Sequence, residues 1–414
     1  MRLAATLGAV ALAVSASPLL VAGGATPPSA CTPDLSVIAP LVEQYLALRP
    51  NLEGMGVVIA TTDGQWFKQY WRGYNDSTVV PIASATKWPT SALIMTMVDE
   101  GLLSLDDTVA TYLPEFGAGL LAQITLGQCL SHTSGLPGES PLISDGTITL
   151  AEAVRQIAAA GLRTDAQGQP VIPGTDFCYG GVSMHVAGRV AEVVAGVPYA
   201  TLLAQRVTGP LDMGSTTFVL GTLDNPRIAG GLGSSLPDYE NFTRMLLARG
   251  QHDGGSFLTA LSVATIIDDR VSGAPATCIP PTADRAAYGV GCWIDIVGPG
   301  GFTHQASSPG AFGFNPWVDV RRGYHGIVMI RGQNADVDSL VEQIQAGIRS
   351  RVDALRRALG DANTDGFVNG ADLSIILAQF GQTVAPGTGS DFNGDGLVDG
   401  ADLSVLLSRF GQEC

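Results

Sequence analysis

A serine and a lysine three residues apart have the clearest chemical use in this chain. Ser84 and Lys87 lie in the stretch "IASATKWPTSALIMTMVDEG", in a sequence with only two lysines among its 22 basic residues. On a helix this spacing places both side chains on one face, where a neutral amine can take the proton of the hydroxyl and make it a nucleophile. Arginine could not do this, because its guanidinium stays protonated. The alternative is a surface helix on which Lys87 is only solvated.

The segments around this pair predict the elements that position it. "STVVPIA" has the character of a β-strand, and "SALIMTMVDEG" predicts an amphipathic helix that ends at Gly101. At the start of such a helix, the backbone N–H of Ser84 can point at a developing oxyanion. Pro89 is unexpected inside this helix and predicts a distorted second turn.

Further motifs resemble the serine β-lactamase-like hydrolase superfamily, which includes class C β-lactamases, D-alanyl-D-alanine carboxypeptidases and related esterases. They run in order over about residues 57–330 and include "ITLGQCLSHTSGLPG", "PGTDFCYGGVSMHVAGRVAEVVAG" and "GFTHQASSPGAFGFNPWVDV". The resemblance implies an α+β domain over residues 32–355, with an antiparallel sheet flanked by helices. A mostly helical region is expected between about residues 101 and 226. We expect His132, in "SHTSG", to be a hydrogen-bonded turn residue.

The same resemblance assigns roles to five residues. Ser84 would be the acylated nucleophile and Lys87 its base or proton shuttle. Tyr179 would relay a proton to the leaving group, and His304 would stand in the third motif of the family. The backbone N–H groups of Ser84 and Ser307 would form the oxyanion hole. No cofactor is expected for catalysis.

Two departures from the family pattern bear on the substrate. The tyrosine motif ends in Gly181, where relatives carry an asparagine whose amide binds β-lactam and peptide substrates. The third motif has Ala306 in place of glycine, although Gly310, six residues after His304, supports the alignment. These departures favour an ester hydrolase acting on a small-molecule ester or amide. A carboxypeptidase or β-lactamase is one alternative, and a non-catalytic surface binding protein of the same fold is another.

The last 55 residues contain two copies of one unit. The copies begin at Asp361 and Asp391, and 14 of 22 aligned positions are identical. Each copy spaces its oxygen-bearing side chains as an EF-hand loop does, with glycine at the sixth position. We predict one structural calcium ion in each loop. The expected ligands are Asp361, Asn363, Asp365, the carbonyl of Phe367, Asn369 and Asp372, then Asp391, Asn393, Asp395, the carbonyl of Leu397, Asp399 and Asp402.

The repeated unit has one helix per loop. Apolar residues follow each loop at helical spacing, and the twelfth loop position is aspartate rather than the glutamate of sensor EF-hands. With the linker "TVAPGTGS", residues 360–414 resemble a dockerin type I module, a small all-α unit with two calcium loops. The resemblance implies a cohesin-like protein partner. The alternative is a calcium-stabilised tail without a partner.

Charge and the N-terminus bear on the cellular location. A net charge of −16 argues against a nucleic-acid partner, because phosphate binding requires clustered lysine and arginine. Residues 1–30 are predicted to be an export signal and a short stub, with Arg2 before the apolar residues 3–22. The protein is therefore expected to be secreted or bound to the cell surface. An uncleaved membrane anchor is the alternative, and lipidation of Cys31 is weakly indicated.

The six cysteines suit an exported protein with disulfides. Six cysteines allow 15 connectivities, and the sequence does not choose among most of them. Cys278 and Cys292 are the preferred pair, because they close a short loop.

Overall fold

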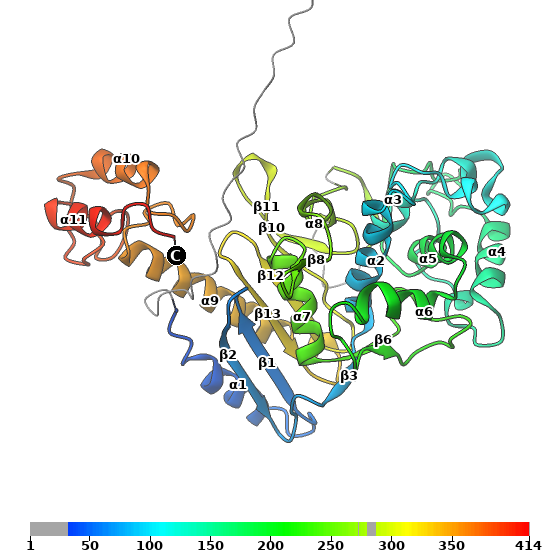
Figure 1. Cartoon of the computed structure of the whole chain (residues 1–414), viewed down its shortest axis with the longest axis horizontal. Helices are drawn as coiled ribbons and strands as arrows, with labels where there is room; N and C mark the ends of the chain where they lie inside the picture. Colours follow the sequence, from blue (N-terminus) through cyan, green and yellow to red (C-terminus); the bar gives the residue numbers. More distant parts are fainter. Residues whose placement is uncertain (1–31, 272, 280–286, 414) are drawn as a thin grey trace, which may run out of the picture.

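A six-stranded antiparallel sheet forms the centre of the structure, a computed structural model that describes residues 32–271, 273–279 and 287–413 (Figure 1). The strand order is β10-β11-β12-β13-β1-β2. The strands are β1 (Met55–Ala60), β2 (Gln65–Trp71), β10 (Trp293–Val297), β11 (Thr303–Ser307), β12 (Phe314–Asp319) and β13 (Tyr324–Met329). The expected export signal, Cys31 and Cys414 lie outside the described residues.

Helices cover both faces of this sheet. Val57 and Ile59 of β1 pack into one core with α1 (Ile38–Ala47) and α9 (Asp338–Ala358), whereas Val58 enters the core on the other face. That second core includes α2 (Lys87–Asp99), α7 (Leu236–Leu247) and α8 (Ala260–Ile266). Because successive strand residues point to opposite faces, a strand buried on both sides reads as the continuous apolar run "MGVVIA".

A mostly helical region lies beside the sheet, as the resemblance implied (Figure 1). Its helices are α3 (Leu126–Leu130), α4 (Leu150–Ala160), α5 (Val182–Ala195) and α6 (Tyr199–Leu203), the last followed by the π-helical turn η7 (Ala204–Thr208). The smaller sheets are β3 (Val79–Pro81) with β6 (Leu232–Ser235) and β5 (Thr217–Phe218); β4 (Phe177–Cys178) with β9 (Ala276–Cys278); and β7 (Gln251–His252) with β8 (Gly255–Ser256). Over the described part of the chain, no single helix meets the length and hydropathy of a membrane span, and α5 with residues 199–208 does so only as a pair bent by 82°.

Helix α2 differs from its prediction in two ways. Lys87 to Met97 are all buried, so the helix is not amphipathic but surrounded by the core. A helix without a face toward solvent does not need a polar stripe, and the polar side chains of α2 are buried with the apolar ones. The α-helix begins at Lys87, after the 3₁₀ turn η2 (Ala83–Thr86), so Pro89 lies in the first turn. Proline is tolerated there, because the first backbone N–H groups have no partner within the helix.

The two C-terminal repeats form one small unit, seen at one end of the molecule in Figure 1. Its helices are α10 (Gly370–Gln379) and α11 (Gly400–Arg409), and Ile376 and Leu406 meet in its core. The twin repeat covers only part of the apolar face of each helix, because Leu377, Phe380, Leu407 and Phe410 remain 48–58% exposed. Helix α9 ends at Ala358, three residues before the first loop residue, Asp361.

A buried histidine ties α5 to the loop before α4. His185 Nε2 lies 2.8 Å from Asn225 Oδ1, while Asn225 Nδ2 donates to the carbonyls of Leu142 and Asp145. With both amide hydrogens used, Asn225 offers an acceptor, so His185 Nε2 must donate. Burial lowers the pKa of His185 to about 4.

This histidine predicts a pH dependence of stability. In the unfolded chain His185 is protonated near pH 6.5, whereas in the native protein it is protonated only near pH 4. The free energy of unfolding should therefore fall between these values, by on the order of 3 kcal/mol from this residue. In His185→Gln the amide can still donate to Asn225, but it does not titrate. Urea unfolding of the wild type and His185→Gln should be measured from pH 7 to 4. The free energy of unfolding should fall less over this range for the variant than for the wild type. Parallel curves would contradict the prediction.

Candidate active site

Ser84 and Lys87 meet where the 3₁₀ turn passes into α2. Lys87 Nζ lies 3.1 Å from Ser84 Oγ and 2.9 Å from the carbonyl oxygen of Ala229. Lys87 is only 3% exposed, so the alternative of a solvated surface lysine is wrong. A neutral amine here could accept the serine proton, because no bulk water competes for it. The sequence did not reveal Ala229, because a backbone acceptor leaves no pattern in side chains.

The backbone around Ser84 is tightly fixed. Ala83 has a φ of 44°, in the left-handed region that non-glycine residues rarely adopt. A Cβ at Gly310 would lie 2.0 Å from the carbonyl oxygen of Ile82, so only glycine lets these two segments meet. Ser308 Oγ donates to the carbonyl of Ser84 at 3.2 Å. Ser308 directly follows β11 and was missed in the sequence. Because successive strand residues point to opposite faces, its side chain could have been expected on the other face from that of Ser307.

Tyr179 lies next to this pair within a group of aromatic rings. Lys87 Nζ is 4.6 Å from the centre of the Tyr179 ring. The ring centroids of Trp293 and His132 lie 5.1 Å and 5.0 Å from that of Tyr179. His132 is a turn residue with a φ of 59°, and its carbonyl accepts the N–H of Cys178 at 2.9 Å, as expected of a hydrogen-bonded turn residue. Its ring nitrogens have no hydrogen-bond partner among the described residues. Burial lowers the pKa of His132 well below its usual value. Its neutral ring therefore packs like an aromatic residue.

His304 and Ser307, on β11, are placed differently from this group. The His304 ring lies against Gly298, where an added Cβ would be 1.9 Å from Nε2. Burial and the charge of Arg321 lower its pKa. Within the described chain, no hydrogen bond joins His304 to Ser84 or Lys87. Ser307 Oγ donates to Asp295 at 2.8 Å, so the role expected for Ser307 depends on its backbone N–H.

The two glycines after Tyr179 have little room for side chains. A Cβ at Gly180 would lie 1.8 Å from the carbonyl oxygen of Gly138, so glycine is required there. A Cβ at Gly181 would lie 2.5 Å from Ile143 Cδ1, and 3.7 Å from a Glu139 carboxylate oxygen. Ile143 therefore occupies space that an asparagine at Gly181 would need. The missing amide is replaced by an apolar group and not by another amide.

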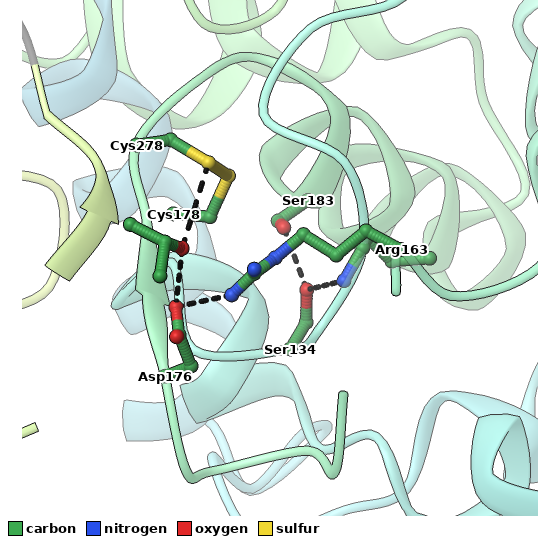
Figure 2. The surroundings of a disulfide bond; sticks show 8 residues. Ser134, Arg163, Asp176, Cys178, Ser183 and Cys278 are labelled. Carbon is green, nitrogen blue, oxygen red and sulfur yellow. Dashed lines mark hydrogen bonds and ion pairs between the residues drawn. A yellow bond between two sulfur atoms is a disulfide. The ribbon is translucent and has the colours of Figure 1, made fainter. Parts of the chain in front are cut away.

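A disulfide joins Cys178 to Cys278, and Figure 2 shows it with its surroundings. The preferred pair Cys278 and Cys292 is therefore wrong, and Cys129 and Cys292 are free and buried. Short spacing in sequence does not fix where the side chains point, and the fold places Cys178 on β4 directly beside β9. Next to the bridge, Tyr179 N donates to the carbonyl of Cys278 at 2.8 Å.

An ion pair lies just before β4 in the chain and adds to the contacts between β4 and β9. Asp176 pairs with Arg163 and accepts a hydrogen bond from Thr277 Oγ1 at 2.7 Å (Figure 2). Two residues on β9, Thr277 and Cys278, therefore hold the segment that carries Tyr179. Such a cross-link limits how far Tyr179 can move from Lys87.

The two C-terminal loops have the same hydrogen-bond frame. Asp361 accepts the N–H groups of Asp365 and Gly366 at 3.1 and 2.8 Å, and Asp391 accepts those of Asp395 and Gly396 at the same distances. Both glycines have left-handed φ angles, 95° and 87°. Burial, together with the carboxylate of Asp372, raises the pKa of Asp361. Oxygen-bearing side chains that follow one another around a tight loop suit a hard divalent cation such as calcium.

Comparison with known proteins agrees with this geometry. The family model described as Beta-lactamase matches residues 38–347. The chain belongs to the beta-lactamase family. The model of the Dockerin type I domain matches residues 359–410. The long match makes the first domain a serine hydrolase of this family, and the short match accounts for the helical module with two loops.

Individual relatives cover only parts of the chain. Penicillin-binding protein 4 of Amycolatopsis lactamdurans is 29% identical over 264 residues, 56% of this chain and 66% of that protein, just under two thirds of its length. A candidate beta-lactamase from Bacteroides dorei DSM 17855 has a TM-score of 0.66 and 28% identity, covering 76% of this chain and all of that one. EstCE1, a hydrolase with promiscuous acyltransferase activity, has a TM-score of 0.60 over 77% of this chain and 98% of its own. At 18% identity, this last similarity shows the fold alone.

We expect the disulfide to stabilise the hydrolase domain. Cys178 and Cys278 are 100 residues apart, and a cross-link over so long a loop stabilises by about 2–4 kcal/mol, mainly through the unfolded chain. Replacing both by serine should lower the melting temperature under oxidising conditions. Cys129→Ala, at a free cysteine, is the control: it keeps the bridge, so reductant should lower its melting temperature as much as it lowers that of the wild type. If reductant leaves the melting temperature of the wild type unchanged, the bridge has no such role.

Proposed function

We propose that this protein is an exported serine hydrolase that cleaves esters through an acyl-enzyme on Ser84. The single observation that carries this proposal is the buried contact between Lys87 Nζ and Ser84 Oγ at 3.1 Å. A serine hydroxyl is a weak nucleophile until a neighbouring base accepts its proton. Lys68, the other lysine of the chain, has a different environment and pairs with Asp76.

Each step of the proposed reaction uses a group already described. Ser84 Oγ attacks the carbonyl carbon, and its proton passes to the neutral amine of Lys87. The backbone N–H groups of Ser84 and Ser307 would bind the resulting oxyanion. The alcohol leaves with a proton relayed by Lys87 or Tyr179, whose ring lies 4.6 Å from the amine. Water then attacks the acyl group by the reverse sequence of proton transfers.

The surroundings of Gly181 support an ester as the substrate. β-Lactams and peptides carry an amide that an asparagine at this position would bind, and Ile143 takes up that space. A buried amide group without a partner is costly, so an ester that needs none should be preferred. The match to the Beta-lactamase family keeps a D-alanyl-D-alanine carboxypeptidase or β-lactamase as the second candidate.

The two lysines provide a matched test of this proposal. Lys87→Arg keeps a positive charge but cannot accept a proton, so hydrolysis of p-nitrophenyl butyrate should fall by about a thousandfold or more. Lys68→Arg should leave the rate unchanged, because Lys68 lies in a surface ion pair with Asp76. Ser84→Ala should abolish both turnover and labelling by a fluorophosphonate probe. Nitrocefin turned over faster than the ester would refute the substrate preference, and equal labelling of wild type and Ser84→Ala would refute the nucleophile.

For the C-terminal module, we propose that it binds two calcium ions and docks on a cohesin-like protein of a scaffold or cell surface. The Dockerin type I match and the identical frames of the two loops support this proposal. Calcium would neutralise the carboxylates that meet in each loop and so stabilise the two short helices. An exported, surface-associated hydrolase fits a module of this kind.

Calcium removal should unfold the module and leave the hydrolase domain folded. In hydrogen exchange measured by mass spectrometry, a chelator should greatly speed exchange in α10 and α11. Strands β1 and β13 provide an internal control and should exchange as slowly as before. A double variant, Asp361→Ala with Asp391→Ala, should show fast exchange in α10 and α11 even with calcium. If the chelator changes nothing in α10 and α11, the loops do not depend on calcium.

A further inference from the structure

A second cluster of possible ligand atoms lies away from Ser84, where a hairpin meets the segment after η7. His252 ends strand β7, Asp253 follows it in the turn to β8, and Asp212 comes four residues after η7. One ligand atom from each residue can be chosen so that all three lie within 4.8 Å of one another. The proposed hydrolase chemistry uses none of these three residues.

The imidazole of His252 shows that this is more than a group of surface charges. Its side chain is only 8% exposed, and Nε2 is buried without a hydrogen-bond partner among the described residues. The atom faces Asp212 Oδ2 at 3.5 Å and Asp253 Oδ2 at 3.8 Å. Neither contact is a hydrogen bond, and a buried polar nitrogen without a hydrogen bond costs free energy. A bound cation would satisfy all three groups.

The distances come close to those of a metal site. Zinc binds nitrogen and oxygen ligands at about 2.0–2.2 Å, which in a tetrahedron puts neighbouring ligand atoms roughly 3.3–3.6 Å apart. The two carboxylates are 70% and 75% exposed, so their side chains can close the remaining gap without moving the core. Two carboxylates and a neutral imidazole leave a charge of −2, which a divalent cation balances.

We propose that Asp212, His252 and Asp253 bind a zinc ion, with water completing its coordination. The imidazole argues against calcium and magnesium, which prefer oxygen ligands, and zinc commonly takes histidine and carboxylate together. His252 also lines an open cavity of about 590 Å³, with Glu100, Arg206 and Phe257, which gives the ion a route from solvent. Both aspartates stand in left-handed turns, which aspartate tolerates, so His252 carries the inference and they do not.

The ion would add a further link between two segments that the contact of His252 with Asp212 already brings together. Asp212 belongs to the connection that leads toward β5, and the hairpin β7–β8 follows α7. A zinc ion between them would restrain the hairpin and line one wall of the cavity. This role is structural and is independent of the reaction proposed for Ser84.

Zinc titration of the full chain by calorimetry tests the proposal, with calcium at saturation so that the C-terminal loops are filled. The wild type should take up one zinc ion that His252→Gln does not bind. Asp212→Asn and Asp253→Asn should each weaken this binding by about tenfold or more, because even groups that only orient a ligand contribute that much. Asp106→Asn, at another exposed aspartate, should bind zinc as the wild type does.

Cobalt serves as a second probe, since its absorption spectrum reports nitrogen ligation. The cobalt spectrum of the wild type should show a bound nitrogen ligand, and that of His252→Gln should not. If His252→Gln fails to fold by circular dichroism, the two aspartate variants decide, because both replace exposed side chains. The proposal is overturned if the wild type binds no zinc beyond its calcium sites, or if the folded variants bind it as tightly as Asp106→Asn does.

Discussion

The burial of one amine against one hydroxyl is the constraint on which the centre of this molecule depends. Lys87 reaches Ser84 and Ala229 and is otherwise enclosed by the core, so its surroundings must supply acceptors and exclude water. This explains the buried 3₁₀ turn, the helix surrounded on all sides, and the glycine at 310 that admits a carbonyl from the opposite segment. The long helices α1 and α9 pack on the other face of the sheet and support it from behind.

What the sequence could predict was mostly local. Short stretches of chain define both the Ser84–Lys87 pair and the repeated loops that begin at Asp361 and Asp391. The structure brings Ser84 and Lys87 together as predicted. Contacts between distant segments were not accessible in this way. The bridge between Cys178 and Cys278 spans 100 residues, and the aromatic setting of His132 comes from several separate segments. The spacing of residues along the chain does not predict these contacts, because they depend on how distant segments pack together.

Packing explains why glycines follow Tyr179 in this chain. Gly180 cannot be replaced, because the backbone of Gly138 passes where its Cβ would stand. Gly181 was read from the sequence as a missing amide, but it also makes room for Ile143 beside the site. The side chain that meets Gly181 is thus an apolar one from the core, while Ser84 and Lys87 are in contact as the family pattern requires. Chemistry and substrate choice are in this sense carried by different residues, which can change separately.

The two calcium-type loops are nearly identical in sequence but differ in their surroundings. Arg321, in the turn between β12 and β13, donates to the carbonyl of Asn363 and to Thr364 Oγ1 in the first loop. The backbone of the same turn donates to the carbonyl of His304, so the first loop and strand β11 are linked through one arginine. The second loop is held within the module, where Gly387 N donates to Asp391. Among the described residues, the first loop is therefore bonded to the hydrolase domain through Arg321, whereas Asp391 of the second loop accepts its hydrogen bonds from within the module.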